Sequence, residues 1–600
     1  MNVHVSAPDG ERAGDTPAKA WLRALEMTAP IAASPTRILP VVIDEAAARQ
    51  GDAPALVSDR ETLTYRALAA RANRYARWAL AQGVAKGDTV CLIMPNRPDY
   101  MAAWLGITRV GGVVALINTN LIGRALAHCI DIVAPRHVIV AAELIEAFTG
   151  ARLHLVARPR VWTHDADADS GRRIDRDLAH YADGPLTVAE QRPVTIDDKA
   201  LYIYTSGTTG LPKAANVSHA RVLTWSFWFA GMMGTGPGDR MYDCLPMYHS
   251  VGGVVATGAL LVSGGAVVIR EKFSARQFWD DVARFDCTLV QYIGELARYL
   301  VNAPPHPREA SHRLRLACGN GLHADVWETF RQRFAIPHIL EFYAATEGNL
   351  SLYNADGKVG AIGKVPSFLA HRLPAAIIRI DPERNEPMRD AQGFCIRCAA
   401  GEPGEAIGRI ERANPGARFD GYTDDEASEK KILRDVFKPG DAWFRTGDLM
   451  RRDAQGYFYF VDRVGDTFRW KGENVSTAEV AAAILRCPGV LDATVYGVAM
   501  PGTDGRAGMA ALVVDHGFDL AALHRHLECL PSYARPVFVR MRQELETTAT
   551  FKHQKGELAR AGYDPAATDD AIYVGDPQQQ AYVRMEPVLF ERIRMGQMRL

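Results

Sequence analysis

The sequence has little excess charge of either sign, and this shortage excludes a class of partner. Its 69 Lys and Arg residues nearly balance its 70 Asp and Glu residues, for a net charge of -1 over 600 residues. No overall field attracts nucleic acid, so we expect no nucleic-acid partner. The hydrophobic fraction of 48% and the charged fraction of 23% are typical of globular proteins, and the length suffices for at least two domains.

Cysteine is also scarce. The nine cysteines are odd in number and scattered, which argues against a disulfide framework. We expect no signal peptide and a reducing, cytoplasmic location. Cys395 and Cys398 form a lone CxxC, and no Cys or His pair nearby completes a zinc site. The pattern favours small residues in a strand.

Long uncharged runs are rare, and only residues 251–269 need to be considered as a possible membrane span. Residues 251–269 carry no charge and are about as long as a membrane span. Their five glycines and the Ser-Gly-Gly break at 263–265 predict a helix, a turn and a strand instead. We expect no transmembrane segment, and peripheral association with the inner face of a membrane stays open.

Apolar runs and helix-like segments alternate in the first part of the chain. This order is typical of βαβ units, in which helices cover a parallel sheet. The expected elements are a helix at 65–80, strands at 90–94 and 113–117 with a helix near 100–108 between them, and strands at 137–140 and 153–156.

The texture changes in the second part. After about Phe394, short strands separated by Gly and Asp predict a small antiparallel subdomain. Ser476 and Glu479 have capping-box spacing, which predicts the start of a helix in a further α/β unit. We therefore predict an α/β fold with a loose arm over 1–35, a large N-terminal domain of helix-covered β-sheets over 36–462 that includes a β-rich subdomain at 394–462, and a smaller C-terminal α+β domain over 463–600.

One stretch, residues 201–213, predicts a polyphosphate-binding loop. It reads Leu-Tyr-Ile-Tyr-Thr-Ser-Gly-Thr-Thr-Gly-Leu-Pro-Lys, a short buried strand followed by hydroxyls, glycines and a lysine. Glycines let backbone N–H groups approach phosphate oxygens, and Lys adds a mobile charge. The alternative is a flexible surface turn. The candidate phosphate contacts are Thr205, Ser206, Gly207, Thr208, Thr209, Gly210 and Lys213.

Six further motifs follow this loop in order. They are Leu245-Pro-Met-Tyr-His-Ser250, Gly319-Asn-Gly-Leu322, Glu341-Phe-Tyr-Ala-Ala-Thr-Glu-Gly-Asn349, Phe444-Arg-Thr-Gly-Asp448, Asp462-Arg-Val-Gly-Asp466 and Thr550-Phe-Lys552. Together they resemble the adenylate-forming superfamily of acyl-CoA synthetases, luciferases and peptide-synthetase adenylation domains, from about residue 40 onward. The runs at 291–296, 342–349, 468–476 and 551–555 resemble its very-long-chain acyl-CoA synthetase and fatty acid transport protein branch.

The resemblance implies an ATP-dependent fatty acyl-CoA synthetase. Such an enzyme forms acyl-AMP and pyrophosphate, then acyl-CoA and AMP, on long or very long chains. ATP, Mg²⁺, coenzyme A and a fatty acid are the implied cofactors and partners, and the oligomeric state stays open. Two alternatives also stay open: an acyl-AMP ligase that passes its product to a carrier protein, and a fatty-acid uptake protein coupled to activation.

The resemblance also implies residue roles. Attack of a carboxylate on the α-phosphorus of ATP brings anions together, so the site must neutralise charge. In this family a mobile smaller domain delivers a catalytic lysine and withdraws it before CoA enters. The implied roles are catalytic Lys552, Thr346 and Glu347, with Glu347 holding Mg²⁺; His249 for positioning; Tyr343, Gly319, Asn320 and Gly321 for adenine; Asp448 and Arg463 for ribose; Gly465 and Asp466 for the hinge; Lys471 and Gly472 for the CoA side; and Lys555 for a phosphate or scaffold contact.

Each role has a plain structural alternative. Glu347 could be a solvated loop carboxylate, Tyr343 and His249 core residues, and Lys552 a surface lysine. Asp448 and Arg463 could form a structural ion pair. Ala344 stands where the family usually has glycine. The aromatic residues Trp225, Phe227, Trp228 and Phe229 could line an acyl channel, although core packing of a helix is the favoured interpretation.

Overall fold

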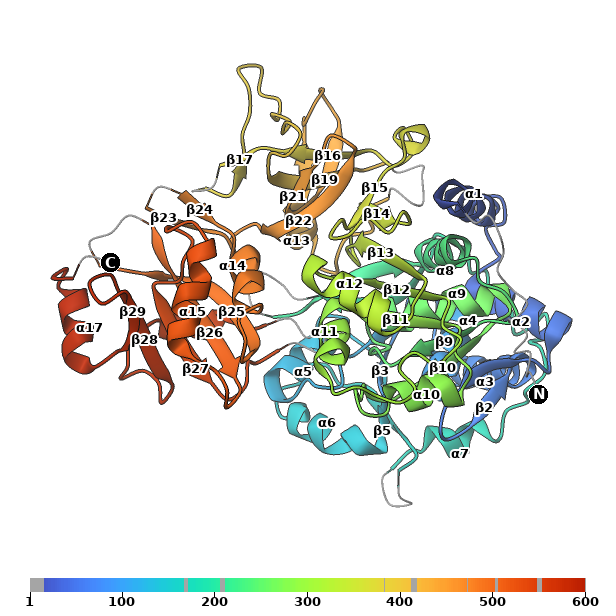
Figure 1. Cartoon of the computed structure of the whole chain (residues 1–600). Coiled ribbons are helices and arrows are strands. Elements are labelled where there is room, and N and C mark those ends of the chain that lie inside the picture. The colour runs from blue at the N-terminus through green and yellow to red at the C-terminus, as the bar shows by residue number, and fades with distance from the viewer. Residues whose placement is uncertain are drawn as a thin grey trace, which may run out of the picture. The chain divides into compact units, whose positions relative to one another are not determined.

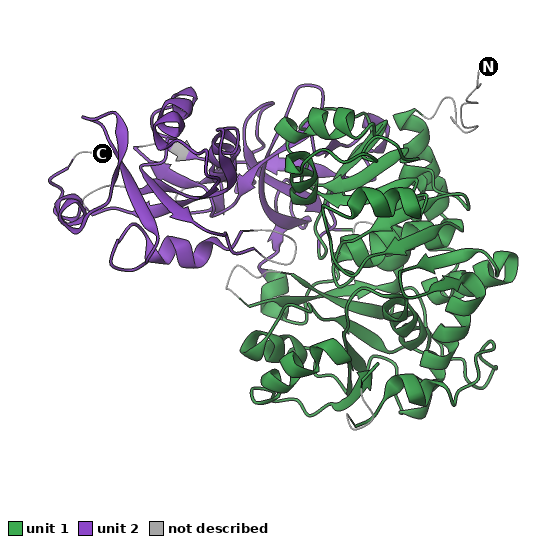
Figure 2. Ribbon diagram, turned by 60° about the horizontal axis from the view of Figure 1, so that its bottom comes forward, with its two compact units in different colours: residues 1–347, 353–360, 411–429 green, residues 348–352, 361–410, 430–600 purple. Residues whose placement is uncertain are grey.

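The computed structural model describes residues 16–166, 171–205, 211–381, 384–411, 418–471, 473–501, 505–547 and 553–598. The chain divides into two compact units (Figure 2). Unit 1 comprises residues 1–347, 353–360 and 411–429, and unit 2 comprises residues 348–352, 361–410 and 430–600. The domain boundary near Arg463 stays a prediction.

The first sheet of unit 1 has six strands in the order β6-β5-β3-β4-β7-β8. Its strands pair in parallel except for the β7–β8 hairpin at one edge. The inner strands β3, β4, β5 and β7 are largely apolar runs, as expected for a parallel sheet that is covered on both faces. The six strands are β3 (Thr89–Ile93), β4 (Val113–Leu116), β5 (His137–Ala141), β6 (Arg160–His164), β7 (Lys199–Thr205) and β8 (Lys213–Ser218).

The second set of strands in unit 1 lies in the order β13-β12-β11-β9-β10-β1-β2 (Figure 1). β1 pairs with β10, β10 with β9, β9 with β11 and β11 with β12, all in parallel, whereas β2 is antiparallel to β1. β12 and β13 are also parallel, so β11, β12 and β13 end at the same edge. The strands are β1 (Pro54–Val57), β2 (Thr62–Thr64), β9 (Arg240–Asp243), β10 (Ala266–Ile269), β11 (Leu289–Ile293), β12 (Leu316–Asn320) and β13 (His338–Ala344).

Helices cover both sets of strands. α5 and α6 pack on β3, β4, β5 and β7, whereas α10, α11 and α12 pack on β9, β11 and β12. The helices of unit 1 are α1 (Pro17–Thr28), α2 (Leu39–Gln50), α3 (Tyr65–Ala81), α4 (Pro98–Arg109), α5 (Gly123–Asp131), α6 (Ile145–Arg152), α7 (Ile174–Leu178), α8 (His219–Met233), α9 (Thr257–Ser263), α10 (Phe278–Arg284), α11 (Gly294–Asn302), α12 (Ala324–Arg333) and α13 (Asp425–Glu429).

Two sequence expectations in unit 1 are wrong. Residues 17–28, expected in a loose arm, form α1, because Trp21 is buried with its ring 5.7 Å from that of Trp228 in α8. Residues 153–156, expected as a strand, follow α6 instead, and the neighbouring strand is β6. Leu153 and Val156 are apolar yet 86% and 84% exposed, so their pattern did not mark a buried strand.

The uncharged run at 251–269 folds as expected. A π-helical turn (Val251–Ala256) leads into α9, Gly264 ends the helix at φ +87°, and β10 follows. A backbone at this φ suits glycine. Among the described residues, no helix is both long enough and apolar enough to cross a membrane.

Unit 2 begins with short antiparallel strands, as expected, although they start at Gly363, before the change of texture expected at about Phe394. β16 pairs with β19, β19 with β21, β21 with β20 and β22, and β22 with β15. The strands are β15 (Gly363–Lys364), β16 (Ala375–Ile378), β17 (Ile380–Asp381), β18 (Glu386–Pro387), β19 (Gly404–Arg409), β20 (Ile432–Arg434), β21 (Ala442–Arg452) and β22 (Tyr457–Arg463).

The rest of unit 2 is a five-stranded sheet in the order β25-β26-β27-β28-β29 with its own core. The Ser476 hydroxyl caps α14 by accepting the Glu479 N–H at 3.2 Å, which confirms the predicted helix start. The elements are β23 (Phe468–Trp470), β24 (Glu473–Val475), α14 (Thr477–Ile484), β25 (Val490–Ala499), β26 (Arg506–Val514), α15 (Leu520–His526), β27 (Phe538–Arg542), α16 (Lys555–Ala561), β28 (Ala571–Asp576), β29 (Ala581–Arg584) and α17 (Pro587–Arg594).

Candidate functional site

The predicted phosphate loop joins the two strands of the β7–β8 hairpin. Thr205, the last residue of β7, is the register partner of Lys213, the first residue of β8. The buried Tyr202 and Tyr204 anchor β7 in the core below. The hairpin therefore brings Thr205 and Lys213 together. The loop residues Ser206, Gly207, Thr208, Thr209 and Gly210 lie outside the described residues.

A segment from far along the chain lies against β8. The Asn216 N–H donates to Gly421 O at 2.9 Å, and the Asn216 side-chain amide donates to the carbonyls of Asp420 and Tyr422, each at 3.0 Å. These bonds lay residues 420–422 along the outer edge of the hairpin. Tyr422, which is 5% exposed, is thereby carried to the end of the hairpin that bears the loop.

The Tyr422 side chain lies among three of the predicted site residues. Its hydroxyl donates to Glu347 Oε1 at 2.7 Å, and the Thr205 side chain lies near enough to lower the pKa of the same phenol. The Lys213 Nζ lies 5.8 Å from the centre of the Tyr422 ring, within cation–π range. Burial, and then the Glu347 carboxylate, raise the pKa of Tyr422 well above its ordinary value. The phenol therefore stays protonated and remains a donor.

A buried arginine ties the loop that carries Glu347 to the same segment. Arg221, in the first turn of α8, donates to Thr346 O at 3.3 Å and to Arg418 O at 2.6 Å. Its guanidinium also pairs with Asp420 at 3.4 Å. Burial lowers the pKa of Arg221, and the carboxylates of Asp420 and Glu347 oppose that shift. The group remains a cation far above neutral pH, so it supplies positive charge next to Glu347.

Thr346 and His249 come from neighbouring loops. The hydroxyl of Thr346 shares a hydrogen bond of 3.1 Å with the hydroxyl of Ser250. His249 is half-buried, and its ring lies 4.7 Å from that of Tyr248. The Gly253 N–H donates to His249 O at 2.8 Å, so the π-helical turn fixes the backbone of this residue. His249 is thus held beside Ser250 and, through it, beside Thr346.

The glycine turn after β12 rests on a buried carboxyl group. Glu341, in β13, is 1% exposed, and its Oε1 accepts the N–H groups of Gly321 at 2.5 Å and Leu322 at 3.1 Å. The Tyr292 hydroxyl donates to Oε2. Burial raises the pKa of Glu341 to about 8, against the opposing effect of these donors. Gly321 adopts φ +84°, a conformation that favours glycine.

Asn320 and Tyr343 lie at the same edge of these strands. Asn320 ends β12, and its Oδ1 is buried without a hydrogen-bond partner among the described residues. Tyr343 is half-buried near the end of β13, unlike its neighbour Phe342, which packs on Phe229 at 4.7 Å between ring centres. An unpaired amide oxygen and a partly open aromatic ring are suited to a planar, hydrogen-bonding molecule.

Two predicted ribose contacts face each other in unit 2. Asp448 in β21 and Arg463 in β22 are register partners, and Arg463 Nε lies 3.8 Å from Asp448 Oδ1. They therefore form the ion pair that the sequence left as an alternative. Arg463 is 45% exposed, so this pair adds little stability.

The predicted hinge contacts α16, which in turn contacts α14. Gly465 has φ +92° with open space where a Cβ would lie. Its neighbour Asp466 pairs with Lys555 at 3.4 Å, and Lys555 also donates to Thr477 at 2.8 Å. Lys555 thus makes the scaffold contact that was one of its two predicted roles. Lys471 is exposed, with its Nζ 5.7 Å from the Trp470 ring; Gly472 and Lys552 lie outside the described residues.

The aromatic residues of α8 mostly pack in the core. Phe227, Trp228 and Phe229 are at most 8% exposed, and Trp228 lies 5.6 Å from Tyr353. Trp225 is half-buried, 5.7 Å from the guanidinium of Arg221. Core packing, the favoured interpretation, therefore accounts for three of the four residues.

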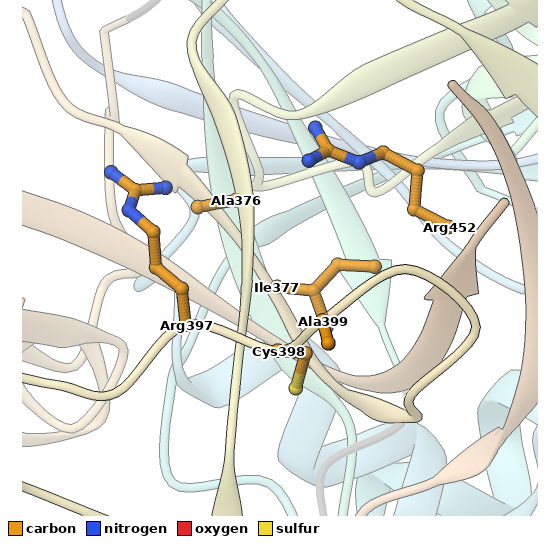
Figure 3. Close-up of a pocket in the computed structure, with 6 residues that line it drawn as sticks. All are labelled: Ala376, Ile377, Arg397, Cys398, Ala399 and Arg452. Atoms are coloured by element: carbon orange, nitrogen blue, oxygen red, sulfur yellow. The ribbon is translucent and has the colours of Figure 1, made fainter. Parts of the chain in front are cut away.

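Unit 2 also has a small hollow, shown in Figure 3. The Arg397 guanidinium stacks on Phe437, 3.5 Å from the ring centre, and Cys398 Sγ donates to Pro403 O at 3.6 Å. The lining residues are Ala376, Ile377, Arg397, Cys398, Ala399 and Arg452. The hollow therefore shares no residue with the predicted nucleotide site.

Sequence reasoning assigned no role to Tyr422, Arg221, Asp420 or Glu341. Glu341 stands at the head of a recognised motif, and Arg221 is a charged residue within an otherwise apolar helix; both were available as signals. Nothing local marks Tyr422, because its contact with Glu347 spans 75 residues.

Comparisons with known proteins show the family of this chain. The AMP-binding enzyme family model matches residues 43–405, and the AMP-binding enzyme C-terminal domain matches residues 479–552. Long-chain fatty acid transport protein 1 of Mus musculus is 41% identical over 567 residues, which cover 93% of this chain and 88% of that protein.

Solved structures share the fold. The anthranilate CoA ligase AuaEII, in complex with anthranoyl-AMP, has a TM-score of 0.75 at 21% identity and covers 88% of this chain and 98% of its own. A Mycobacterium tuberculosis fatty acyl CoA synthetase has a TM-score of 0.61 at 22% identity, and the similarity covers 87% of this chain and 98% of that chain. The predicted fold class is confirmed. This chain belongs to the AMP-binding enzyme family of the adenylate-forming superfamily, in the branch of the fatty acid transport proteins and very-long-chain acyl-CoA synthetases.

Proposed function

We propose that this enzyme is an ATP-dependent fatty acyl-CoA synthetase acting on long or very long chains. It would form acyl-AMP and pyrophosphate, then acyl-CoA and AMP. The observation that carries the proposal is the grouping of Thr205, Lys213 and Glu347 around Tyr422, where the predicted phosphate loop joins β7 and β8. This grouping offers cations and donors for phosphates and one carboxylate for a metal.

The cationic, hydroxyl and carboxylate groups of this site in unit 1 suit a nucleoside triphosphate with its metal ion. We assign phosphate binding to Thr205, Lys213 and the loop residues 206–210, and the metal to Glu347 with Thr346 beside it. The described residues contain no group of three or more His, Cys, Asp and Glu able to hold a metal ion. A single carboxylate fits Mg²⁺, which in nucleotide sites takes most of its ligands from phosphates and water. When bound, Mg²⁺ would neutralise charge on the phosphate oxygens.

Adenine recognition is assigned to the glycine turn and Tyr343. The Asn320 Oδ1 needs a donor, and the exocyclic amino group of adenine is one. Gly319 and Gly321 keep the backbone open to close approach, and the half-buried Tyr343 ring offers a stacking face. We assign the ribose hydroxyls to Asp448 and Arg463, whose partly exposed ion pair would be exchanged at low cost for bonds to the sugar.

Domain movement is the proposed link between the two half-reactions. Lys552 would stabilise the charge that develops on the α-phosphate during adenylation. Rotation at Gly465 and Asp466 would then exchange Lys552 for the segment at Lys471 and Gly472, beside which CoA would enter. Gly465 suits this role because glycine absorbs large changes of φ and ψ.

The substrate class is proposed from the relatives. Long-chain fatty acid transport protein 1 is similar over 93% of this chain, and its printed name specifies long-chain fatty acids. His249, next to Ser250, is proposed to position the reacting carboxylate. We further propose a cytoplasmic location with peripheral association at the inner face of a membrane, because long-chain acids partition into lipid.

One assay tests the proposal: pyrophosphate release across a panel of carboxylic acids of increasing chain length, with and without CoA. The expected result is release that depends on Mg²⁺ and on a long-chain acid, with acyl-CoA as the final product. Acyl-adenylate that accumulates without acyl-CoA would instead identify an acyl-AMP ligase. No release with any acid would refute both activities.

A second function, fatty-acid uptake, is favoured by the names of the relatives. Uptake by trapping requires activation, because acyl-CoA does not recross the membrane. Cells that express Lys552→Ala should therefore lose uptake together with synthetase activity. Uptake that survives in this variant would make transport a separate function.

A further inference from the structure

The predicted site in unit 1 is assembled from segments far apart in the sequence. The phosphate loop follows β7, Glu347 follows β13, and Tyr422 belongs to a segment laid along β8. A carboxylate on a loop has several rotamers of similar energy, so something must fix it for a metal to bind tightly. In this structure a hydrogen bond from Tyr422 holds one of the two Glu347 oxygens.

We propose that Tyr422 is a positioning residue for the metal site: its hydroxyl orients the Glu347 carboxylate beside the phosphate loop. This inference rests on the proposed function. The bond from Tyr422 takes Oε1 of Glu347, and among the described residues no hydrogen bond is made to Oε2 of Glu347. Oε2 is therefore the oxygen that can bind a metal ion. An outer partner that fixes a ligand in this way raises metal affinity without touching the metal.

A second set of contacts supports the same arrangement independently. The Arg221 guanidinium donates to Thr346 O, directly before Glu347, and pairs with Asp420, two residues before Tyr422. Arg418 holds the other oxygen of Asp420 at 2.9 Å. The loop of Glu347 and the segment of Tyr422 are therefore joined twice, so the distance between phenol and carboxylate is fixed by buried bonds on both sides.

The variant Tyr422→Phe separates positioning from phosphate binding. It removes only the hydroxyl and keeps the ring face that Lys213 approaches. We expect the Mg²⁺ concentration needed for tight binding of a non-hydrolysable ATP analogue to rise about tenfold, as for loss of an outer partner of a metal ligand. Binding of the analogue in EDTA should stay within about twofold of wild type, since the cation–π contact remains. Calorimetric titration measures both.

Tyr65→Phe is the matched control. Tyr65 is fully buried in unit 1, and its hydroxyl donates to Gly265 O at 2.8 Å, without contact to a predicted site residue. This variant should keep the Mg²⁺ dependence of wild type, and melting curves of both variants should show that each is folded. In pyrophosphate release, Tyr422→Phe should show the same tenfold shift in Mg²⁺ requirement and recover at saturating Mg²⁺.

Two outcomes would overturn the inference. One is a Tyr422→Phe protein with the Mg²⁺ dependence of wild type; the other is an equal loss of analogue binding with and without the metal, which would mean a general disturbance of the site. If wild type releases no pyrophosphate with any acid, the proposed synthetase activity fails, and the calorimetric comparison still decides the role of Tyr422.

Discussion

Replacing Glu341 should disrupt the glycine turn in proportion to the hydrogen bonds that the new side chain leaves unmade. Glu341 is 1% exposed and accepts the N–H groups of Gly321 and Leu322 and the hydroxyl of Tyr292. In Glu341→Ala, all three donors stay buried without an acceptor. In Glu341→Gln, the amide oxygen accepts the two N–H groups, and the amide nitrogen donates to the Tyr292 oxygen.

The magnitudes follow from those bonds. A buried donor left unsatisfied costs about 1–3 kcal/mol, so the alanine variant should lose about 4 kcal/mol of unfolding free energy, before any cavity is counted. Near pH 5.5 the glutamine variant should stay within about 1 kcal/mol of wild type, because the raised pKa leaves Glu341 protonated there, and its Oε2–H, like the amide N–H, donates to the Tyr292 oxygen. Alanine should also weaken binding of the ATP analogue, since the 319–321 turn loses its support.

The pH dependence gives a second measure of the same site. Burial raises the pKa of Glu341 to about 8 in the folded protein, above its ordinary value of 4.5. The folded state therefore binds the proton more tightly than the unfolded state, and this contribution to stability is lost as pH rises from 4.5 to 8. Wild type should lose stability relative to Glu341→Gln at up to about 1.4 kcal/mol per pH unit in that window and level off above it.

Denaturant unfolding monitored from pH 5.5 to 9, with hydrogen exchange of the Gly321 and Leu322 amides, measures both effects. The two amides should exchange faster in the alanine variant than in the glutamine variant. Equal destabilisation by alanine and glutamine would refute the role of the three bonds. Parallel pH curves for wild type and Glu341→Gln would refute the raised pKa.

Three further perturbations have defined outcomes. Lys552→Ala should slow adenylation by about 10²-fold or more, as for loss of one charge-stabilising donor, while thioester formation from supplied acyl-adenylate survives; equal loss of both steps would contradict the domain exchange. Lys555→Met should cost about 1 kcal/mol or less of stability, because its pair with Asp466 is partly exposed; a large fall in adenylation at unchanged stability would make it a phosphate contact instead. Burial lowers the pKa of His219 to about 4, so stability should fall as pH drops from 6.5 towards 4. His219→Gln should flatten that decline by up to about 3 kcal/mol in acid unfolding, and an unchanged slope would argue against a buried neutral ring.

Local patterns predicted many elements of this protein well. The apolar period of 65–80 predicted α3, and the capping pair Ser476 and Glu479 predicted the start of α14, because these signals depend on residues only a few positions apart. The strand expected at 153–156 failed because apolar residues also stand exposed at the end of a helix. Whether such a residue is buried depends on what packs over it.

The order of its motifs was enough for the sequence to determine the family and the reaction class and to predict the site residues, since phosphate loops, carboxylates and glycine turns carry their chemistry in short segments. Tertiary structure alone decided that Tyr422 holds Glu347, that Arg221 joins Thr346 to Asp420, and that Glu341 supports the turn at Gly321. These contacts join segments 20 to 199 residues apart. Their partners are chosen by sheet register and burial, which no local pattern encodes.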